Sequence, residues 1–142
     1  IAKETLAEIN RIRMLCGLKK VIQDKEISQG CAEHAKYLMV HMPDLSGQNE
    51  AEGEKVHRQD PTLTHASNKG AIAASNSVIV GSTQNGTTAI QSFMQSLFHR
   101  IPLLNPDLEK VGIGVELYPL DSDRWCVVCD VRQGVRGGKS SK

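Results

Sequence analysis

The sequence lacks an excess of either charge, a dense set of cysteines and any long apolar run. Its 142 residues include 17 basic and 16 acidic side chains, for a net charge of +1. Such a balance leaves no excess of positive charge that would favour binding to nucleic acid or to an anionic membrane. No apolar segment approaches the roughly 20 residues that a membrane-spanning helix needs, and we find no signal peptide or internal repeat. Because the chain begins with Ile1 rather than methionine, we expect a mature form or an excised piece of a longer protein.

Four cysteines are too few for a disulfide-built scaffold, and they allow three pairings. A bridge could join Cys16, at the end of a first helix, to Cys31 in a second. Cys126 and Cys129 form a C-x-x-C, which suggests a redox or zinc site. However, residues three apart in a strand point to opposite faces, and a redox C-x-x-C normally begins a helix. The pattern therefore favours two buried strand cysteines, and it leaves the redox compartment open.

Hydropathy periodicity predicts two helices, a strand, a third helix and a hairpin. The expected helices cover 2–15, Asp24 to about residue 41, and about 88–99, and the expected strands cover 75–80, 111–118 and 124–131. Asp24 can cap the second helix. Residues 43–70 are polar and lack convincing periodicity, and a loop of that length is more often functional or locally helical than idle.

The segment from residue 88 to 114 carries the most information. Its first half predicts one amphipathic helix with a buried stripe of Ala89, Ile90, Phe93, Met94 and Leu97. Thr87 or Thr88 can cap the start of this helix. Pro102 stops it, because proline lacks the N–H donor and restricts the residue before it. His99 is thereby expected where the helix gives way to a loop, a position from which an imidazole can face a cleft.

Several short motifs follow one another in a fixed order along the chain. They are Ile9-Asn10-x-x-Arg13, Gly17-Leu18, Cys31-x-x-His34-Ala35, Phe93-Met94, Ser96, His99-Arg100, Leu103-Leu104-Asn105-Pro106 and Val111-Gly112-Ile113-Gly114. In this order they resemble the bacterial branch of the CAP superfamily, the cysteine-rich secretory, antigen and pathogenesis-related (SCP-like) proteins, over about residues 5–131. The resemblance implies an α+β fold, a three-layer α-β-α sandwich with a small antiparallel sheet flanked by helices.

The predicted division of the chain is one CAP domain at 1–132 and a flexible C-terminal tail at 133–142. The tail is glycine-rich, basic and free of apolar periodicity, which favours a flexible end or linker over a nucleic-acid arm.

The resemblance also implies a cleft where a loop histidine, a Glu-Asn pair and the histidine of His-Arg converge. His57 has the better spacing for the loop histidine, and His65 is the reserve candidate. His34 and His41 share a helical face, and a structural role is favoured for both. The expected cleft residues are His57, Ser75, Asn76, His99 and Arg100.

Ser75 stands where the family has a carboxylate. A hydroxyl serves poorly as a general base or as an anionic metal ligand. His57 and His99 could hold a divalent cation such as zinc, but catalytic zinc sites normally have three protein ligands and a water. Asp60 or Glu54 could supply the third ligand.

Arg100 and two serines also lie in this region. Arg100 could anchor an anionic ligand, although a helix-end role with backbone carbonyls is favoured. Ser92 and Ser96 lack an identifiable acid partner, so no catalytic residue is assigned.

Two functions from different classes remain. The first is a secreted or extracytoplasmic binding module, expected to be a monomer, whose histidine-lined cleft binds a small ligand, lipid or protein partner without catalysis. Neither nucleic acid nor a membrane span is expected for it. The alternative is a divalent-metal-dependent hydrolase that uses His57 and His99 to hold the ion. The hydroxyl at position 75 favours the first function.

Overall fold

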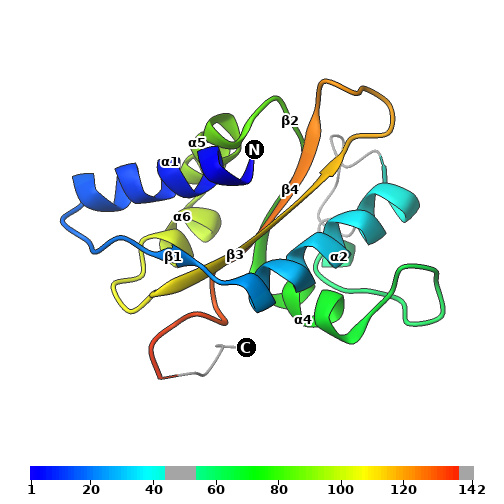
Figure 1. The fold of residues 1–142 in the computed structure, drawn as a ribbon, viewed down its shortest axis with the longest axis horizontal. Coiled ribbons are helices and arrows are strands. Elements are labelled where there is room, and N and C mark those ends of the chain that lie inside the picture. The colour runs from blue at the N-terminus through cyan, green and yellow to red at the C-terminus, as the bar shows by residue number, and fades with distance from the viewer. Residues whose placement is uncertain (44–53, 138–142) are drawn as a thin grey trace.

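The computed structural model describes residues 1–43 and 54–137 (Figure 1). In chain order the elements are α1 (Ala2–Leu15), β1 (Ile22–Gln23), α2 (Lys25–His41), α4 (Asn68–Asn76), β2 (Ser77–Thr83), α5 (Gly86–Met94), α6 (Leu97–Leu103), β3 (Lys110–Leu117) and β4 (Trp125–Asp130).

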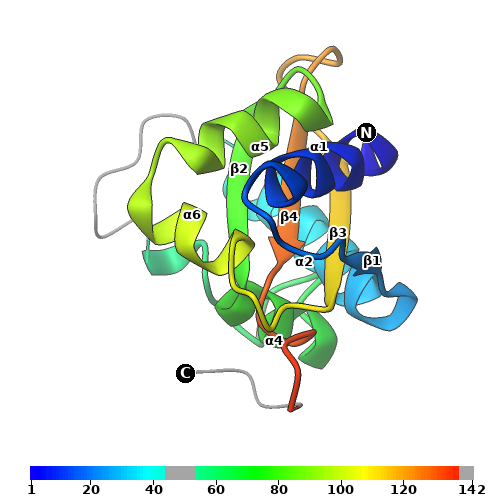
Figure 2. The same cartoon turned by 90° about the vertical axis from the view of Figure 1, so that its left-hand side faces the viewer.

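The strands form one sheet in the order β1-β3-β4-β2, and helices cover both of its faces. Strands β3 and β2 each pair with β4 in antiparallel fashion, whereas the two-residue β1 runs parallel to β3. Helices α1, α5 and α6 lie over one face, and α2 and α4 lie over the other (Figures 1 and 2). The predicted α-β-α sandwich is confirmed, and β1 makes its sheet mixed.

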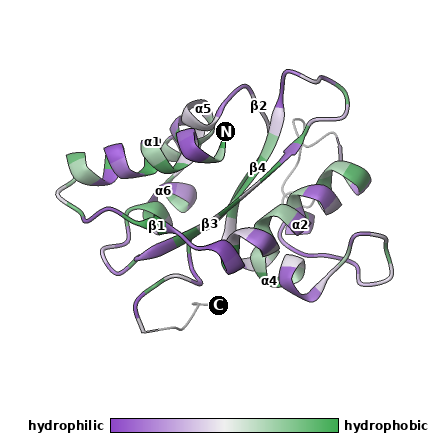
Figure 3. Ribbon diagram, in the orientation of Figure 1, coloured by the Kyte–Doolittle hydropathy of each residue, from purple (hydrophilic) through white to green (hydrophobic). Residues whose placement is uncertain are grey.

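Each face of the sheet has its own hydrophobic core, so the strands are apolar on both sides (Figure 3). Cys129 packs in the core beneath α1 and α5, while Cys126 packs in the core beneath α2. The prediction that these two buried sulfurs diverge is therefore confirmed. All four cysteines are free, and the possible bridge from Cys16 to Cys31 is not formed, because Cys16 is exposed and Cys31 is buried.

Helix α2 lies unusually close to β3. The carboxylate of Asp24 accepts a hydrogen bond from the backbone N–H of Ile27, which is the predicted N-cap. Where the helix crosses the strand, β3 carries Gly112 and Gly114 on the facing side. A Cβ at Gly114 would overlap the backbone of α2 at Cys31. The absence of these two side chains sets the distance between helix and sheet.

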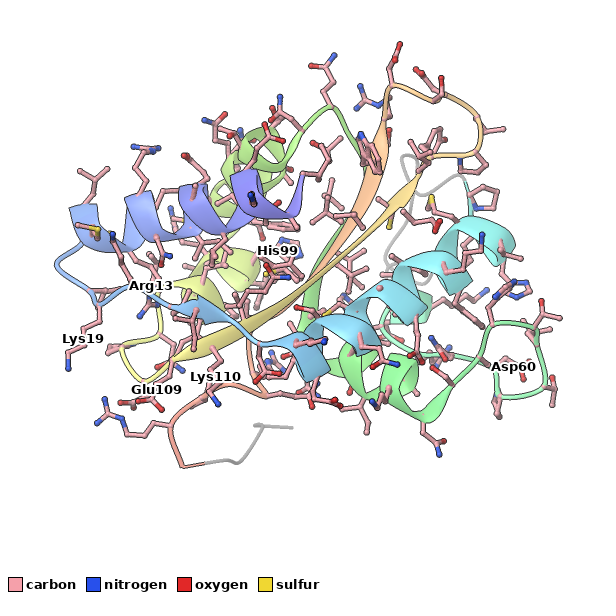
Figure 4. The ribbon with its side chains drawn as sticks, viewed as in Figure 1. Arg13, Lys19, Asp60, His99, Glu109 and Lys110 are labelled. Carbon is pink, nitrogen blue, oxygen red and sulfur yellow. The ribbon has the colours of Figure 1, made fainter. Side chains whose placement is uncertain are left out.

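A buried arginine joins α1 to the loop before β3. The side chain of Arg13 is fully buried, and its guanidinium donates only to backbone carbonyls, those of Lys19, Leu103, Asn105 and Leu108. In Figure 4, Arg13 extends from α1 toward that loop. Gly17, with a φ of 74°, ends α1 in the left-handed conformation that turns the chain around this arginine.

The single helix expected at 88–99 is two helices, and this prediction is wrong. Asn85, rather than Thr87 or Thr88, caps α5 by accepting a hydrogen bond from the N–H of Thr88. The chain then breaks at Gln95, and a second helix, α6, starts after Ser96. Its backbone continues through Pro102 to Leu103, whose side chain is buried in the core. Apolar spacing alone did not reveal this break.

Residues 75–76 belong to α4 rather than to the predicted strand. Ser67 caps α4 by accepting a hydrogen bond from the N–H of Gly70, and β2 follows directly at Ser77. The helix escaped prediction because its buried positions are small or polar: Gly70, Ala73, Ala74 and Asn76. Such a stripe has little hydropathy contrast.

The segment after β4 folds back along the start of β3. The carbonyl of Gly134 accepts hydrogen bonds from the N–H groups of Glu109 and Lys110, and the N–H of Arg136 donates to Asp107. Residues 133–137, the first half of the expected tail, therefore pack on the domain. Residues 138–142 lie outside the described residues, as do 44–53 of the expected polar loop.

Candidate functional site

The loop histidine His57 is anchored on the end of α4. Its Nδ1 lies 3.1 Å from the carbonyl oxygen of Ala74. Since a carbonyl only accepts hydrogen bonds, Nδ1 carries the proton and donates. The neutral ring then has its lone pair on Nε2, the atom that remains for a ligand.

His99 lies on α6 within electrostatic range of His57. Its half-buried ring packs against Phe93, with 5.5 Å between ring centroids. Burial lowers the pKa of His99, and the charge of nearby His57 lowers it further. A residue from the polar loop and one from α6 are thus within electrostatic range of each other, and His57 and His99 are called the histidine pair below. His57 is within such range of His34 as well. His99 lies within α6, not where a helix gives way to a loop as expected.

The side chains of Ser75 and Asn76 turn back onto their own helix. The Oγ of exposed Ser75 and the Nδ2 of buried Asn76 both donate to the carbonyl of Ile72, at 3.1 and 2.9 Å. Both residues are held at the same end of α4 as the carbonyl that anchors His57. The side-chain donor groups of both residues are therefore used within α4.

Arg100 is exposed, and its Nη1 lies 3.5 Å from the carbonyl of Met94. It thus contacts the end of α5 rather than the last turn of its own helix. It also lines a cavity of about 540 Å³. This cavity is lined by Arg100, Ile101, Pro102, Leu104, Asn105, Pro106, Val131, Arg132 and Val135. Neither member of the histidine pair lines this cavity.

His34 and His41 have structural roles. The Nε2 of fully buried His34 donates to the carbonyl of Val56 at 2.6 Å, and its Nδ1 accepts from the amide of Gln59 at 2.9 Å. Both ring nitrogens are used, so His34 offers no lone pair to a ligand. The Nε2 of His41 donates to the carbonyl of Thr64 at 2.7 Å.

The expected third metal ligand does not join the histidine pair. Asp60 is exposed, binds Thr62 and lies near His41, and these neighbours lower the pKa of its carboxyl. His65, the reserve histidine, is exposed with a φ of 65°. Among residues 1–43 and 54–137, no three His, Cys, Asp or Glu side chains gather as metal ligands would. Neither Asp60 nor Glu54, the two residues considered as a third ligand, therefore completes a metal site with the histidine pair in this arrangement.

The family model of the cysteine-rich secretory proteins (CAP) matches residues 6–131. The chain belongs to this family. Its fold is similar to that of an outer surface protein from Borrelia burgdorferi, with a TM-score of 0.57 and 19% sequence identity over 91% of this chain and 90% of that one. No curated protein matches the sequence. Within the part of the CAP domain that the structure describes, no helix has the length and apolar content to span a membrane.

His34 should make the stability of the CAP domain depend on pH. Burial lowers the pKa of His34 to about 4, from an ordinary value of 6.5. Between these values the unfolded chain binds a proton more readily than the folded one. The stabilisation is therefore complete above pH 6.5 and is lost as the pH falls toward 4, by about 3 kcal/mol.

Urea unfolding at pH 7 and pH 4.5 would measure this loss. The matched variant is His34→Gln, whose amide can also donate to Val56 and accept from Gln59. Its unfolding free energy should change much less between the two pH values, since other titrating groups are shared. An equal pH dependence in both proteins would mean that His34 does not cause it.

Proposed function

We propose that this CAP domain is an extracytoplasmic binding module that holds a small ligand, lipid or protein partner at the histidine pair without catalysing a reaction. The proposal rests on which side chains surround the two rings. His57 and His99 lie near each other, yet Ser75 replaces the carboxylate and its hydroxyl donates to Ile72. Two imidazoles can accept hydrogen bonds from a ligand, but the site lacks the carboxylate that could serve as a general base or as an anionic metal ligand.

The alternative is a divalent-metal-dependent hydrolase that uses His57 and His99. One observation favours it: the Nδ1 of His57 donates to a backbone carbonyl, which is how metal-binding histidines are commonly oriented. Against it stands the absence of a third ligand among the described residues. Two imidazoles do not fit a catalytic zinc site, which normally has three protein ligands.

Placement outside the cytoplasm is part of the proposal. It is supported by the secretory members for which the family is named and by the outer surface protein with a similar fold.

Metal analysis of the purified protein separates the two functions. We expect less than stoichiometric zinc, and a melting temperature that neither micromolar zinc chloride nor a chelator changes appreciably. A bound ion would raise the melting temperature by mass action. Stoichiometric metal that is retained through dialysis, with a chelator-sensitive melting temperature that His57→Ala abolishes, would overturn the non-catalytic proposal.

A second prediction tests the pairing of the two rings. The charge of His57 contributes to the low pKa of His99, so His57→Ala should raise that pKa. The measurement is an NMR titration of the imidazole resonances. His41→Ala, which removes an imidazole bound to Thr64, is the matched control and should leave the His99 titration unchanged. Unaltered titration of His99 in the His57 variant would mean that the two rings do not share a site.

A further inference from the structure

A second cavity, of about 480 Å³, lies between the C-terminal part of α2 and the segment that leads to α4. Its lining consists of Tyr37, His41, Met42, Lys55, Arg58, Gln59, Asp60 and Leu63. Neither member of the histidine pair belongs to this lining, and the cavity at Arg100 shares no residue with it. Its volume is in the range of sites for small organic ligands.

Lys55 and Arg58 bring two positive charges to the wall of this cavity. They lie three residues apart in a turn that the backbone N–H of Arg58 closes by donating to the carbonyl of Lys55 at 3.3 Å. This spacing brings their side chains near each other. Both residues are exposed. Within the described residues, neither side chain has an ion pair with a carboxylate. Two like charges at this spacing repel each other, and an anion bound between them would relieve the repulsion.

Asp60 adds one negative charge to the same cavity. It lies in the loop beside α2 (Figure 4), and its backbone N–H donates to the hydroxyl of buried Tyr37 at 2.9 Å. The hydroxyl and the N–H of Thr62 donate to Oδ1 of Asp60, at 2.7 and 2.9 Å, and they lower the pKa of its carboxyl. Within the described residues, Oδ2 has no hydrogen bond and forms no ion pair with Lys55 or Arg58. Charges of both signs therefore line one cavity without neutralising each other.

The other lining groups supply apolar surface and one hydroxyl proton. The hydroxyl of Tyr37 accepts from Asp60, and its own proton has no acceptor within the described residues. Both halves of the Gln59 amide already have partners. Met42 and Leu63 add apolar side chains, which a ligand with an apolar group would cover.

We propose that this cavity binds a free α-amino acid with an apolar side chain. Its carboxylate binds at Lys55 and Arg58, and its ammonium group donates to Oδ2 of Asp60. Its side chain contacts Met42 and Leu63. A simple anion would be repelled by the carboxylate, and a simple cation would have two like charges beside it, whereas a zwitterion matches both signs. The site goes beyond the proposed function, because it uses neither member of the histidine pair.

Titration calorimetry with three compounds that share one apolar group tests the proposal. L-Phenylalanine carries both charges, 3-phenylpropionate lacks the ammonium group, and phenethylamine lacks the carboxylate. We expect saturable binding of phenylalanine and at least about tenfold weaker binding of the other two, because each lacks a charge-assisted hydrogen bond. Glycine, which lacks the side chain, should not bind measurably. In NMR spectra, phenylalanine should shift the backbone amide resonances of residues 37–42 and 55–63.

Two variants assign the charges of the ligand to their partners. Asp60→Asn keeps an oxygen that can accept from Thr62, and it should abolish the preference for phenylalanine over 3-phenylpropionate. Arg58→Gln should reduce the preference for phenylalanine over phenethylamine about tenfold. Both variants should keep the melting temperature near that of the wild type. Arg100→Gln, the matched control, removes an exposed arginine outside this lining and should leave all binding unchanged.

Three results would each overturn the proposal. The first is that phenylalanine does not bind. The second is that 3-phenylpropionate or phenethylamine binds the wild-type protein as tightly as phenylalanine does. The third is that Asp60→Asn and Arg58→Gln keep the wild-type preferences, or that Arg100→Gln alters binding as much as they do.

Discussion

Replacing Arg13 with methionine is expected to lower the unfolding free energy by about 3–5 kcal/mol. Arg13 is fully buried, and four backbone carbonyls accept hydrogen bonds from its guanidinium. Methionine fills part of the space but donates nothing, so buried carbonyls at the ends of α1 and α6 would lose their partners. Because an ordinary domain has only about 5–15 kcal/mol of stability, this one change could remove much of it.

Chemical unfolding followed by circular dichroism measures this loss. Arg13→Lys keeps the positive charge but cannot reach several carbonyls at once, so its stability should lie between those of the wild type and Arg13→Met. Arg58→Met makes the same substitution at an exposed position and should have no measurable effect. If Arg13→Met were as stable as Arg58→Met, the hydrogen bonds around Arg13 would not hold the loop before β3.

Gly114→Ala is expected to cost at least about 3 kcal/mol, although it adds only one methyl group. That methyl would overlap the backbone of α2 at Cys31 and Ala32. A flexible side chain could move aside, but backbone in a packed helix cannot do so without shifting α2 on the sheet. The predicted result is a large loss in the unfolding free energy, measured by urea denaturation.

Gly17→Ala is the matched control for this effect. A Cβ at Gly17 would meet no atom within 4 Å, so only its φ of 74° resists the substitution. The expected loss is about 1 kcal/mol, the cost of a left-handed conformation for alanine. Equal losses at the two positions would show that backbone conformation, rather than contact with α2, limits residue 114.

Sequence patterns predicted the parts of the fold in which hydropathy contrast is strong. Helices α1 and α2 and the hairpin of β3 and β4 lie within a few residues of their expected positions. The divergence of the two sulfurs in the C-x-x-C was predicted from strand geometry alone. Side chains alternate between the two faces of a strand, so Cys126 and Cys129 lie on opposite faces. The N-cap at Asp24 was also predicted, because it depends only on residues that are close in the sequence.

The remaining features depend on tertiary contacts. The break between α5 and α6 leaves the apolar spacing intact, and α4 buries Gly70 and alanines that give little periodic signal. The hydrogen bond from His57 to Ala74 joins a loop to the end of a helix that the sequence did not reveal. The cavity of Arg100 and Arg132 likewise joins segments about 30 residues apart, and no local pattern brings them together.

Of the four cysteines in the folded protein, only one is accessible to a thiol-reactive dye. Burial raises the pKa of Cys31 and of Cys126 to about 12 and also raises the pKa of Cys129, so these three thiols stay protonated and shielded. Cys16 is exposed at the end of α1. A maleimide fluorophore would therefore attach at that single position without engineering, and its emission would report on the turn that encloses Arg13.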